Sequence, residues 1–284
     1  DVANSCRITN CAIEYYNPID RSTSYAWIVF YGRNNRFDHN VVLGKQHAEA
    51  TIVVALDEER NQQNYHRIDH NYFGVRPNYG SNGGETMRIG NSQYAHTSSY
   101  TQIEDNYFEH CSGEVEIISI KSADNIIRRN TFYECEGSVV LRHGKRNTVT
   151  RNMFIGNGKP HTGGVRIINA SQTVTENYFS SLRGNRFRAP LAIMNAVPNS
   201  LPNRYHRVED ALVKNNFFID CSPIELCVGA DNERTESPTK TTVAENVFFN
   251  PSTKEVFLAY DNLDGIFFSD NKVVSVTATV KRKG

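Results

Sequence analysis

Short segments in which apolar and polar residues alternate recur along the whole chain. Alternation with a period of two is typical of β-strands that bury one face. No segment sustains the i, i+3, i+4, i+7 stripe of an amphipathic helix, and the leucine pattern of leucine-rich repeats is missing. The pattern therefore predicts an all-β protein made of many short strands.

The alternating segments share a common phrase. An apolar residue is followed by two polar residues, an asparagine, any residue and then Phe or another apolar residue, as in Ile103, Asn106 and Phe108. The asparagines of the clear copies are Asn40, Asn71, Asn106, Asn130, Asn152, Asn177, Asn216, Asn246 and Asn271. Successive copies are 22 to 39 residues apart, and the shortest spacings suggest a minimal rung of 22 to 25 residues.

Stacked short strands with one asparagine at each turn are typical of a parallel β-helix, and we expect about ten rungs. The asparagines would form a ladder from coil to coil, and the aligned phenylalanines would stack inside. Cys111 and Cys135 follow their asparagines at similar distances, so we expect one above the other.

The longer intervals predict loops inserted into a single catalytic domain over residues 1–284. The largest insertions are 74–85, 155–164 and 180–210, and we expect them to form a binding groove. The segment 180–210 gathers Arg183, Arg186, Arg188, Arg204, His206 and Arg207. It is either an ordinary solvated loop or a basic lip that holds an anionic polymer.

Composition narrows the possible partners. The chain has 31 Lys and Arg against 31 Asp and Glu, which disfavours a globally basic nucleic-acid binder. No apolar run reaches membrane-spanning length. The six cysteines are dispersed without zinc-site spacing, so buried free thiols are expected. The chain starts without Met in a strand-like segment, which we interpret as a mature or excised fragment.

The segment 113–143 carries the candidate chemistry. Glu114 and Glu116 are two residues apart, so in a strand their side chains project to one side. Two adjacent carboxylates repel each other unless a cation lies between them, and calcium prefers several oxygen ligands. The alternative is a solvated strand face with scattered charges.

Overlaying successive rungs brings further polar residues to this face. Setting Asn106 against Asn130 places Glu116 on Val140 and Ile118 on Arg142, with Val115 and Ile117 facing the core. Glu114, Glu116 and Arg142 then point outward together. The next rung adds Arg166 to the same face.

Four segments, NGGETMRIG, SGEVEIISIKS, SVVLRHG and GGVRI, resemble motifs of polysaccharide lyase family 6. This family contains alginate lyases and chondroitinase B, and its fold is the right-handed parallel β-helix. The resemblance covers most of the chain and is densest between Asn82 and Arg166. Family members are typically longer at the N-terminus, so the first rungs and a cap are expected to be missing.

The resemblance implies a role for individual residues. It implies that Asn82, Glu114 and Glu116 bind Ca²⁺, that Lys121 is the Brønsted base and that Arg142 is the Brønsted acid. Substrate contacts are expected from Arg88, His143, Arg166, Arg186 and Arg188. Arg88 could instead form a salt bridge to Glu85, and His143 could instead orient a neighbour.

The expected activity is calcium-assisted β-elimination on a 1,4-linked uronate polymer. Alginate is the first candidate and dermatan sulfate the alternative within the family. A glycoside hydrolase using Glu114 and Glu116 is disfavoured, since such carboxylates usually lie on opposite sides of the scissile bond. A non-catalytic glycan-binding β-helix would not require Lys121. A secreted or periplasmic location follows from the polymer substrate.

Overall fold

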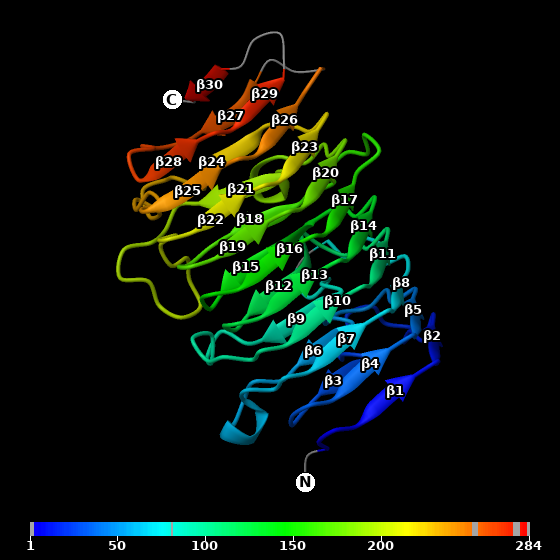
Figure 1. Ribbon diagram of the computed structural model, residues 1–284. Helices are drawn as coiled ribbons and strands as arrows, with labels where there is room; N and C mark the ends of the chain where they lie inside the picture. Colours follow the sequence, from blue (N-terminus) through cyan, green and yellow to red (C-terminus); the bar gives the residue numbers. More distant parts are fainter. Residues whose placement is uncertain (1–2, 81, 252–254, 275–278, 283–284) are drawn as a thin grey trace.

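The computed structural model describes residues 3–80, 82–251, 255–274 and 279–282. Three parallel sheets, A, B and C, each contain ten strands and run the length of the molecule (Figure 1). Each rung contributes one strand to each sheet in turn, so neighbouring strands in a sheet are three apart in number. No α-helix is found in the described part of the chain. The predicted right-handed parallel β-helix of about ten rungs is confirmed.

The strands are short and evenly distributed. Sheet A contains β1 (Arg7–Thr9), β4 (Arg36–Asp38), β7 (Arg67–Asp69), β10 (Gln102–Glu104), β13 (Ile126–Arg128), β16 (Thr148–Thr150), β19 (Thr173–Thr175), β22 (Leu212–Lys214), β25 (Thr241–Ala244) and β28 (Ile266–Ser269). Sheet B contains β2 (Ala12–Glu14), β5 (Val41–Leu43), β8 (Tyr72–Phe73), β11 (Tyr107–Glu109), β14 (Thr131–Tyr133), β17 (Met153–Ile155), β20 (Tyr178–Ser180), β23 (Phe217–Ile219), β26 (Val247–Phe249) and β29 (Lys272–Val274). Sheet C contains β3 (Ile28–Phe30), β6 (Ile52–Val54), β9 (Met87–Gly90), β12 (Glu116–Lys121), β15 (Ser138–His143), β18 (Val165–Ile167), β21 (Leu191–Met194), β24 (Ile224–Val228), β27 (Glu255–Ala259) and β30 (Thr279–Arg282). The described residues also contain two 3-10 turns, η1 (Glu59–Asn61) and η2 (Arg186–Arg188).

A sharp turn joins sheet A to sheet B, and the repeated asparagine occupies it from Asn40 to Asn271, while Cys11 takes this position in the first rung. In the rung of Asn106, the preceding residue Asp105 has a φ of 56°, in the left-handed region. The Asn106 side chain donates hydrogen bonds to Ile68 O at 2.8 Å and to Asn130 Oδ1 at 3.0 Å. The same oxygen of Asn130 accepts the backbone N–H of Asn106. The predicted ladder is therefore present, and it satisfies buried polar groups at every turn.

A second, unpredicted polar ladder lies at the corner between sheets C and A. Asn125 donates to Asn147 Oδ1 at 3.0 Å, and the backbone N–H of Asn147 donates to Gln172 Oε1 at 3.0 Å. The side chains that accept from the preceding rung vary between asparagine, histidine and glutamine, so the sequence shows no constant residue there.

Stacked phenylalanines fill the interior beside sheet B. Rings on successive rungs are stacked with centroids 4.4–5.0 Å apart, from Phe73 to Phe248. Cys111 and Cys135 lie buried in the same core as free thiols. This continuous core holds the rungs at a fixed spacing, so side chains on sheet C are placed rigidly.

Replacing Phe154 with alanine should lower the free energy of unfolding by about 3–5 kcal/mol, because a fully buried ring is removed from the middle of the stack. Met153, its neighbour, is 44% exposed on the outer face. Met153→Ala is the matched control and should change stability by less than about 0.5 kcal/mol. Denaturant unfolding followed by circular dichroism measures the free energy of unfolding of both variants. Equal losses in Phe154→Ala and Met153→Ala would contradict a main stabilising role for the phenylalanine stack.

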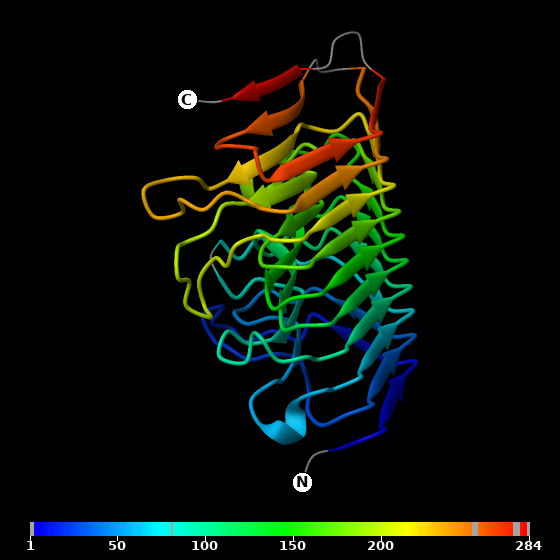
Figure 2. The ribbon, with the colours of Figure 1, turned by 60° about the vertical axis from the view of Figure 1, so that its left-hand side comes forward.

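Longer connections leave the coil on the side away from the straight row of sharp turns (Figure 2). The predicted insertion 180–210 is not one continuous loop, because it contains β21 of sheet C, and the connections before and after this strand lie over the outer face of the sheet. There they form a second small apolar cluster, which was not predicted, with Phe187 and Tyr205 packed against buried residues such as Val140 and Met194. The connections are thus fixed to the sheet that carries the candidate catalytic residues.

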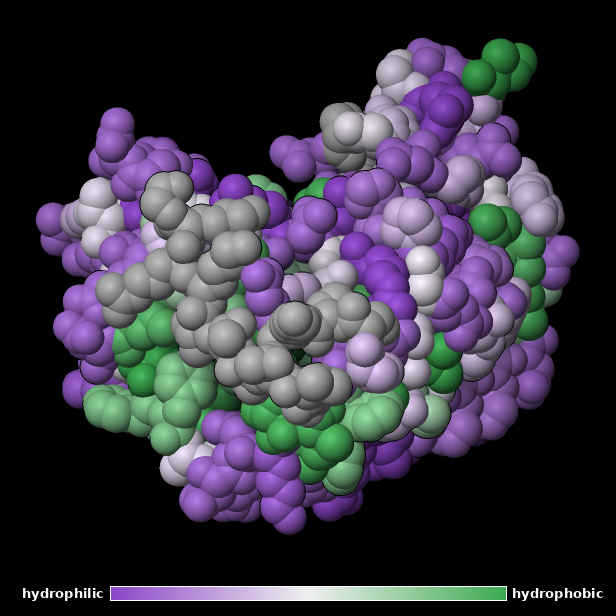
Figure 3. Space-filling view, turned by 90° about the horizontal axis from the view of Figure 1, so that it is seen from above, coloured by the Kyte–Doolittle hydropathy of each residue, from purple (hydrophilic) through white to green (hydrophobic). Residues whose placement is uncertain are grey.

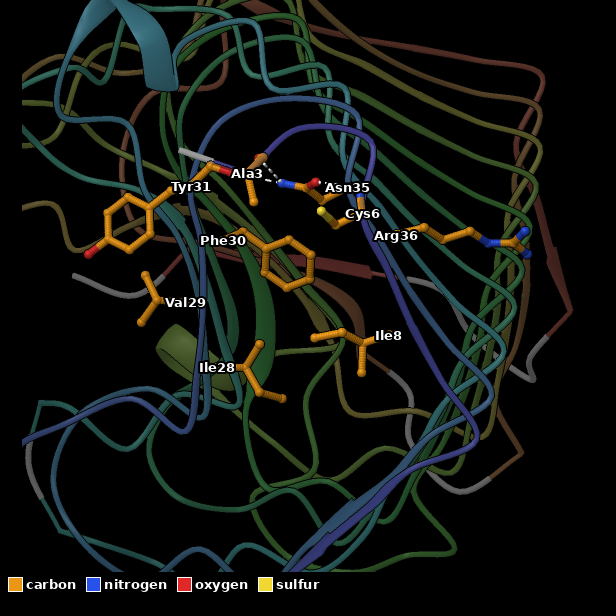
Figure 4. Close-up of a pocket in the computed structure, with 9 residues that line it drawn as sticks. All are labelled: Ala3, Cys6, Ile8, Ile28, Val29, Phe30, Tyr31, Asn35 and Arg36. Atoms are coloured by element: carbon orange, nitrogen blue, oxygen red, sulfur yellow. Dashed lines mark hydrogen bonds between the residues drawn. The ribbon is translucent and has the colours of Figure 1, made fainter. Parts of the chain in front are cut away.

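The N-terminal end of the coil has an apolar pocket of about 230 Å³. Ile8, Ile28 and Phe30 line it from the first rung, and Arg36 points away from it (Figure 4). Seen along the coil from the other end, the molecule is hollowed between two hydrophilic lobes (Figure 3). No helix in the described residues is both long and apolar enough to span a membrane.

Candidate active site

The strands β12 and β15 carry the central candidate residues, but their pairing differs from the predicted overlay. Glu116 pairs with Ser138 rather than Val140, and Lys121 pairs with His143. Irregularities between Glu116 and Ile118 and between Ile120 and Lys121 shift the register, so a constant offset cannot describe the pairing.

These register shifts also change which residues are inside. Ile118 and Ile120 pair with the core residues Val139 and Leu141, whereas Val115 is half-buried. Ile117 is buried as predicted. The predicted overlay of the two rungs was therefore wrong for β12. A bulge adds one residue to a strand, so the side chains after it point to the opposite face from the one that regular alternation predicts.

Glu116 lies between two arginines from the following rungs. Arg166 contacts it through Nη2 in a buried ion pair, and Arg142 Nε is 3.9 Å from the same Oε1 atom. Arg166 is 2% exposed, with its guanidinium 5.2 Å from the Phe187 ring centre. Arg166 therefore reaches this site as predicted, but as a buried partner of Glu116.

Glu114 turns to a different neighbour. It lies in the bend before β12, and the carboxyl group of Glu85 is beside it. Burial first, and then the negative charges of Glu85 and Glu116, raise the pKa of Glu114 to about 9. Glu85 is itself 4% exposed, and its Oε2 has no hydrogen-bond partner among the described residues.

Glu85 and Glu116 thus both lie close enough to act on Glu114, and buried carboxylate oxygens are ligands that suit a hard cation. The described residues contain no group of three His, Cys, Asp or Glu side chains arranged for a metal. Amide or backbone oxygens would therefore have to complete a coordination shell. Asn82 is the predicted amide ligand. It is exposed, two residues before Gly84, whose Cα packs against Gly113 and Glu114.

Lys121 ends β12 and is half-buried. Its ammonium group makes no hydrogen bond or ion pair within the described parts of the chain. The paired residue on β15 is His143, so Arg142 lies on the neighbouring strand next to this pair. The Lys121 side chain is therefore unpaired, whereas the neighbouring Arg142 side chain is held near Glu116.

The segment 180–210 fixes the position of Arg142. The Arg142 guanidinium lies 4.4 Å from the centre of the Tyr205 ring, and its Nη1 donates to Arg204 O at 3.4 Å. Burial lowers the pKa of Arg142, while Tyr205 and Glu116 oppose this shift. The arginine is held between an aromatic ring and a carboxylate, with 17% of its side chain exposed.

His143 is buried, and its Nε2 is 3.2 Å from Ser92 Oγ. Burial, followed by the charges of Arg142 and Lys121, lowers the pKa of His143 to about 2. The imidazole is therefore neutral throughout the physiological range, which argues against an imidazolium as proton donor. Its position favours the interpretation that it orients neighbours.

His143→Gln should make the protein less sensitive to acid. The folded-state pKa is below the ordinary value of about 6.5, so the unfolded chain takes up the proton first and stability falls as pH decreases below 6.5. Between pH 7 and pH 5 this removes about 2 kcal/mol, a loss the variant should not show. Unfolding free energies at both pH values test it, with the exposed His161→Gln as control. An unchanged acid sensitivity would contradict a neutral, buried His143.

Arg88 has a different partner from the one weighed on sequence grounds. Its Nη1 is 2.6 Å from Glu49 Oε1, so Glu85 is not its ion-pair partner. Glu49 belongs to the connection before β6, which sequence spacing could not bring to β9. Arg88 lies on the same register row as Ser119, Val140 and Arg166, and it is partly exposed.

The arginines of 180–210 divide into two groups. Arg188 is near Glu136, Arg166 and Glu114, and its buried Nε has no partner among the described residues. Arg186 is exposed and lies 4.2 Å from the Tyr260 ring centre. The others are engaged elsewhere: Arg183 pairs with Asp220, Arg204 pairs with Glu233 and Arg207 donates to Ser237 O.

Comparison with known proteins gives a match to the chondroitinase B family over residues 1–284. The chain belongs to the chondroitinase B family, polysaccharide lyase family 6 (PL6). A comparison with curated protein sequences gives no match.

Solved PL6 structures share the coil. The alginate lyase AlyGC is 44% identical, with a TM-score of 0.94 over 98% of this chain and 39% of its own. A mannuronic acid specific family 6 lyase from human gut microbiota is 34% identical, with a TM-score of 0.79 over 95% of this chain and 58% of its own. The PL6 chain thus spans less than two thirds of the length of each of these two relatives.

Sequence reasoning missed several residues around this PL6 site. Glu85 belongs to the NGGE segment and was considered only as a partner for Arg88. Tyr205 and Glu49 lie in connections without a repeat, so no spacing indicated their neighbours. Ser92 follows β9 closely and could have been found as the extension of that strand.

Proposed function

We propose that this chain is the catalytic β-helix of a polysaccharide lyase that cleaves a 1,4-linked uronate polymer, with alginate as the first substrate. The observation that carries the proposal is the placement of Lys121 and Arg142 on neighbouring strands, with Lys121 paired to His143 and Arg142 near Glu116. The similarity to AlyGC and to the mannuronic acid specific lyase supports alginate as the polymer.

The reaction would be a β-elimination. Lys121, in its neutral form, takes the proton from C5 of the uronate, and the C5–H electron pair forms the C4=C5 double bond. The C4–O bond breaks, its electrons leave with the oxygen, and a proton converts that oxygen to a hydroxyl. One product carries a 4,5-unsaturated uronate at its new end, and no oxidant or reductant is needed.

Arg142 fits best as a group that stabilises negative charge. Its guanidinium is fixed by Tyr205 and Glu116, and a preorganised cation favours charge that develops on the leaving oxygen or on the carboxylate. A guanidinium keeps its proton under ordinary conditions. The proton for the leaving oxygen would then come through water ordered by Arg142.

Glu114, Glu116 and Asn82 would hold Ca²⁺, with Glu85 adjacent. Bound there, the ion would supply positive charge that neutralises the substrate carboxylate and makes the C5 proton more acidic. The buried and partly unpartnered carboxylates of this cluster support the assignment.

The remaining arginines would bind the polymer at different depths. Arg186 and Arg188 are accessible enough to meet uronate carboxylates, and Arg88 borders a groove of about 260 Å³ that also includes Tyr25 and Tyr31. His143 and Arg166 are buried and would orient Arg142 and Glu116. A secreted or periplasmic enzyme is consistent with a polymeric substrate.

Incubation with alginate, dermatan sulfate and polygalacturonate, followed by ultraviolet absorbance of the unsaturated uronate, tests the proposal. Absorbance should rise fastest with alginate. A rise with dermatan sulfate alone would move the substrate to the chondroitinase B type. Binding to alginate without any absorbance change, with and without calcium, would identify a non-catalytic glycan-binding protein.

A further inference from the structure

Arg76 is a buried arginine that the proposed reaction does not use. It is 3% exposed and lies in the insertion 74–85, between β8 and β9. Its backbone is tied to the next rung, because its N–H donates to His110 O at 3.1 Å and its carbonyl accepts from Ser112 N at 2.9 Å. These two backbone hydrogen bonds fix the position of Arg76 independently of its side-chain contacts.

The guanidinium of Arg76 binds four oxygens in the interior. Its Nε donates to Gly84 O, and its Nη2 donates to Gly83 O at 3.0 Å and to Glu49 O at 2.8 Å. Its Nη1 donates to Thr51 Oγ1 at 2.7 Å. Two of these acceptors, the carbonyls of Gly83 and Gly84, directly follow Asn82. The guanidinium, whose planar fork of N–H donors holds both carbonyls, therefore fixes the backbone after Asn82.

The same guanidinium also packs against the residue before Glu114. A Cβ at Gly113 would lie 2.7 Å from Arg76 Nε and 2.0 Å from Gly84 O, so no larger residue fits while this contact is kept. Tyr79 N donates to Gly113 O at 2.7 Å, which ties the insertion to Gly113 a second time. Arg76 therefore joins the segment of Asn82 to the segment of Glu114.

We infer that Arg76 is a positioning residue for calcium: it holds Asn82 and Glu114, which lie on separate rungs, at the spacing that one ion requires. This inference rests on the proposed function, because Asn82 and Glu114 are the ligands proposed there. The Arg76 guanidinium donates only to protein oxygens, so it would not bind the ion or the substrate directly. Its role is to fix backbone atoms on both sides of the site.

The alternative, a purely electrostatic effect of Arg76, predicts the opposite result. The positive charge of Arg76 is near Glu85 and Glu114. Removing this charge alone would leave the carboxylates more negative, so calcium would bind more tightly. Removing the positioning fork would separate or loosen the ligands, so calcium would bind more weakly.

Calorimetric titration of CaCl₂ into the whole chain distinguishes these effects. Arg76→Met should raise the Kd for calcium by about tenfold or more, as loss of supporting hydrogen bonds does at other metal sites. Arg76→Lys keeps the charge without the planar fork and should also weaken binding. Arg21→Gln is the control, because exposed Arg21 touches the same insertion from outside, through Asn78 O. Its Kd should match that of the unchanged protein.

An unchanged or lower Kd in folded Arg76→Met would overturn the inference while leaving the proposed function intact. Absence of calcium binding by the unchanged protein would overturn the calcium assignment and this inference together. Should Arg76→Met fail to fold, Thr51→Val decides, since it removes one acceptor of the fork and should weaken calcium binding about twofold to threefold. Excess calcium should restore the kcat of folded Arg76→Met, because occupancy of a weakened site recovers by mass action.

Discussion

Replacing Lys121 with alanine should reduce kcat on alginate by about a thousandfold, within the range lost when a general base is removed. In the proposed reaction neither His143, which is buried, nor Arg142, which stays protonated, can replace Lys121 as the base. Lys121→Arg should be almost as inactive, since it restores positive charge but not a neutral base.

The control for this experiment is Lys145→Ala. Lys145 is exposed on the following rung, at the position that a constant 24-residue offset would have matched with Lys121. Its replacement should leave kcat within about twofold of the original. Substantial activity in Lys121→Ala, or full activity in Lys121→Arg, would exclude lysine as the base.

Arg142→Ala should lower kcat by about a hundredfold to a thousandfold, as the loss of a preorganised charge-stabilising group does. Arg142→Lys should recover little of this loss, because an ammonium group cannot both face Glu116 and stack on Tyr205 as the planar guanidinium does. Steady-state kinetics on alginate oligosaccharides measure both variants. The KM should change less than kcat if the group acts mainly in the transition state.

A companion variant examines the support of Arg142. Tyr205→Leu keeps apolar volume under the guanidinium but removes the aromatic face, and we expect about a threefold to tenfold decrease in kcat. Loss of activity in Tyr205→Leu as complete as in Arg142→Ala would indicate that the phenol itself takes part in the reaction. Normal activity in Arg142→Ala would remove this arginine from the mechanism.

The β-helix could be predicted because the residues that form its turns and its core recur in every copy of the repeat. Each copy places an asparagine at the same turn and an aromatic or apolar residue two positions later, so chance agreement among nine copies is small. The ladder from Asn40 to Asn271 and the phenylalanine stack follow directly from this repetition. The second ladder escaped notice because Asn125, Asn147 and Gln172 do not share one residue type.

The site was predictable where it depends on short segments, and unpredictable where it depends on bulges and connections. The segment with Glu114, Glu116 and Lys121 can be recognised from the sequence alone. The offset between β12 and β15 cannot, because Ile117 is an extra residue in β12 and Arg142 is an extra residue in β15, and each changes the register locally. The contacts Arg88 to Glu49 and Arg142 to Tyr205 join residues whose separation follows no repeat.

The sharp turn between sheets A and B has a consequence for how this protein can vary in length. Its left-handed residue and asparagine leave no room for an insertion, since an added residue would break the ladder on both neighbouring rungs. The differences between intervals of 22 and 39 residues must therefore arise at the corners on either side of sheet C. Connections at these corners, such as the residues between β21 and β22, lie outside the phenylalanine stack and can therefore vary in length. Substrate preference can thus diversify, in nature or by design, on a scaffold whose dimensions stay constant.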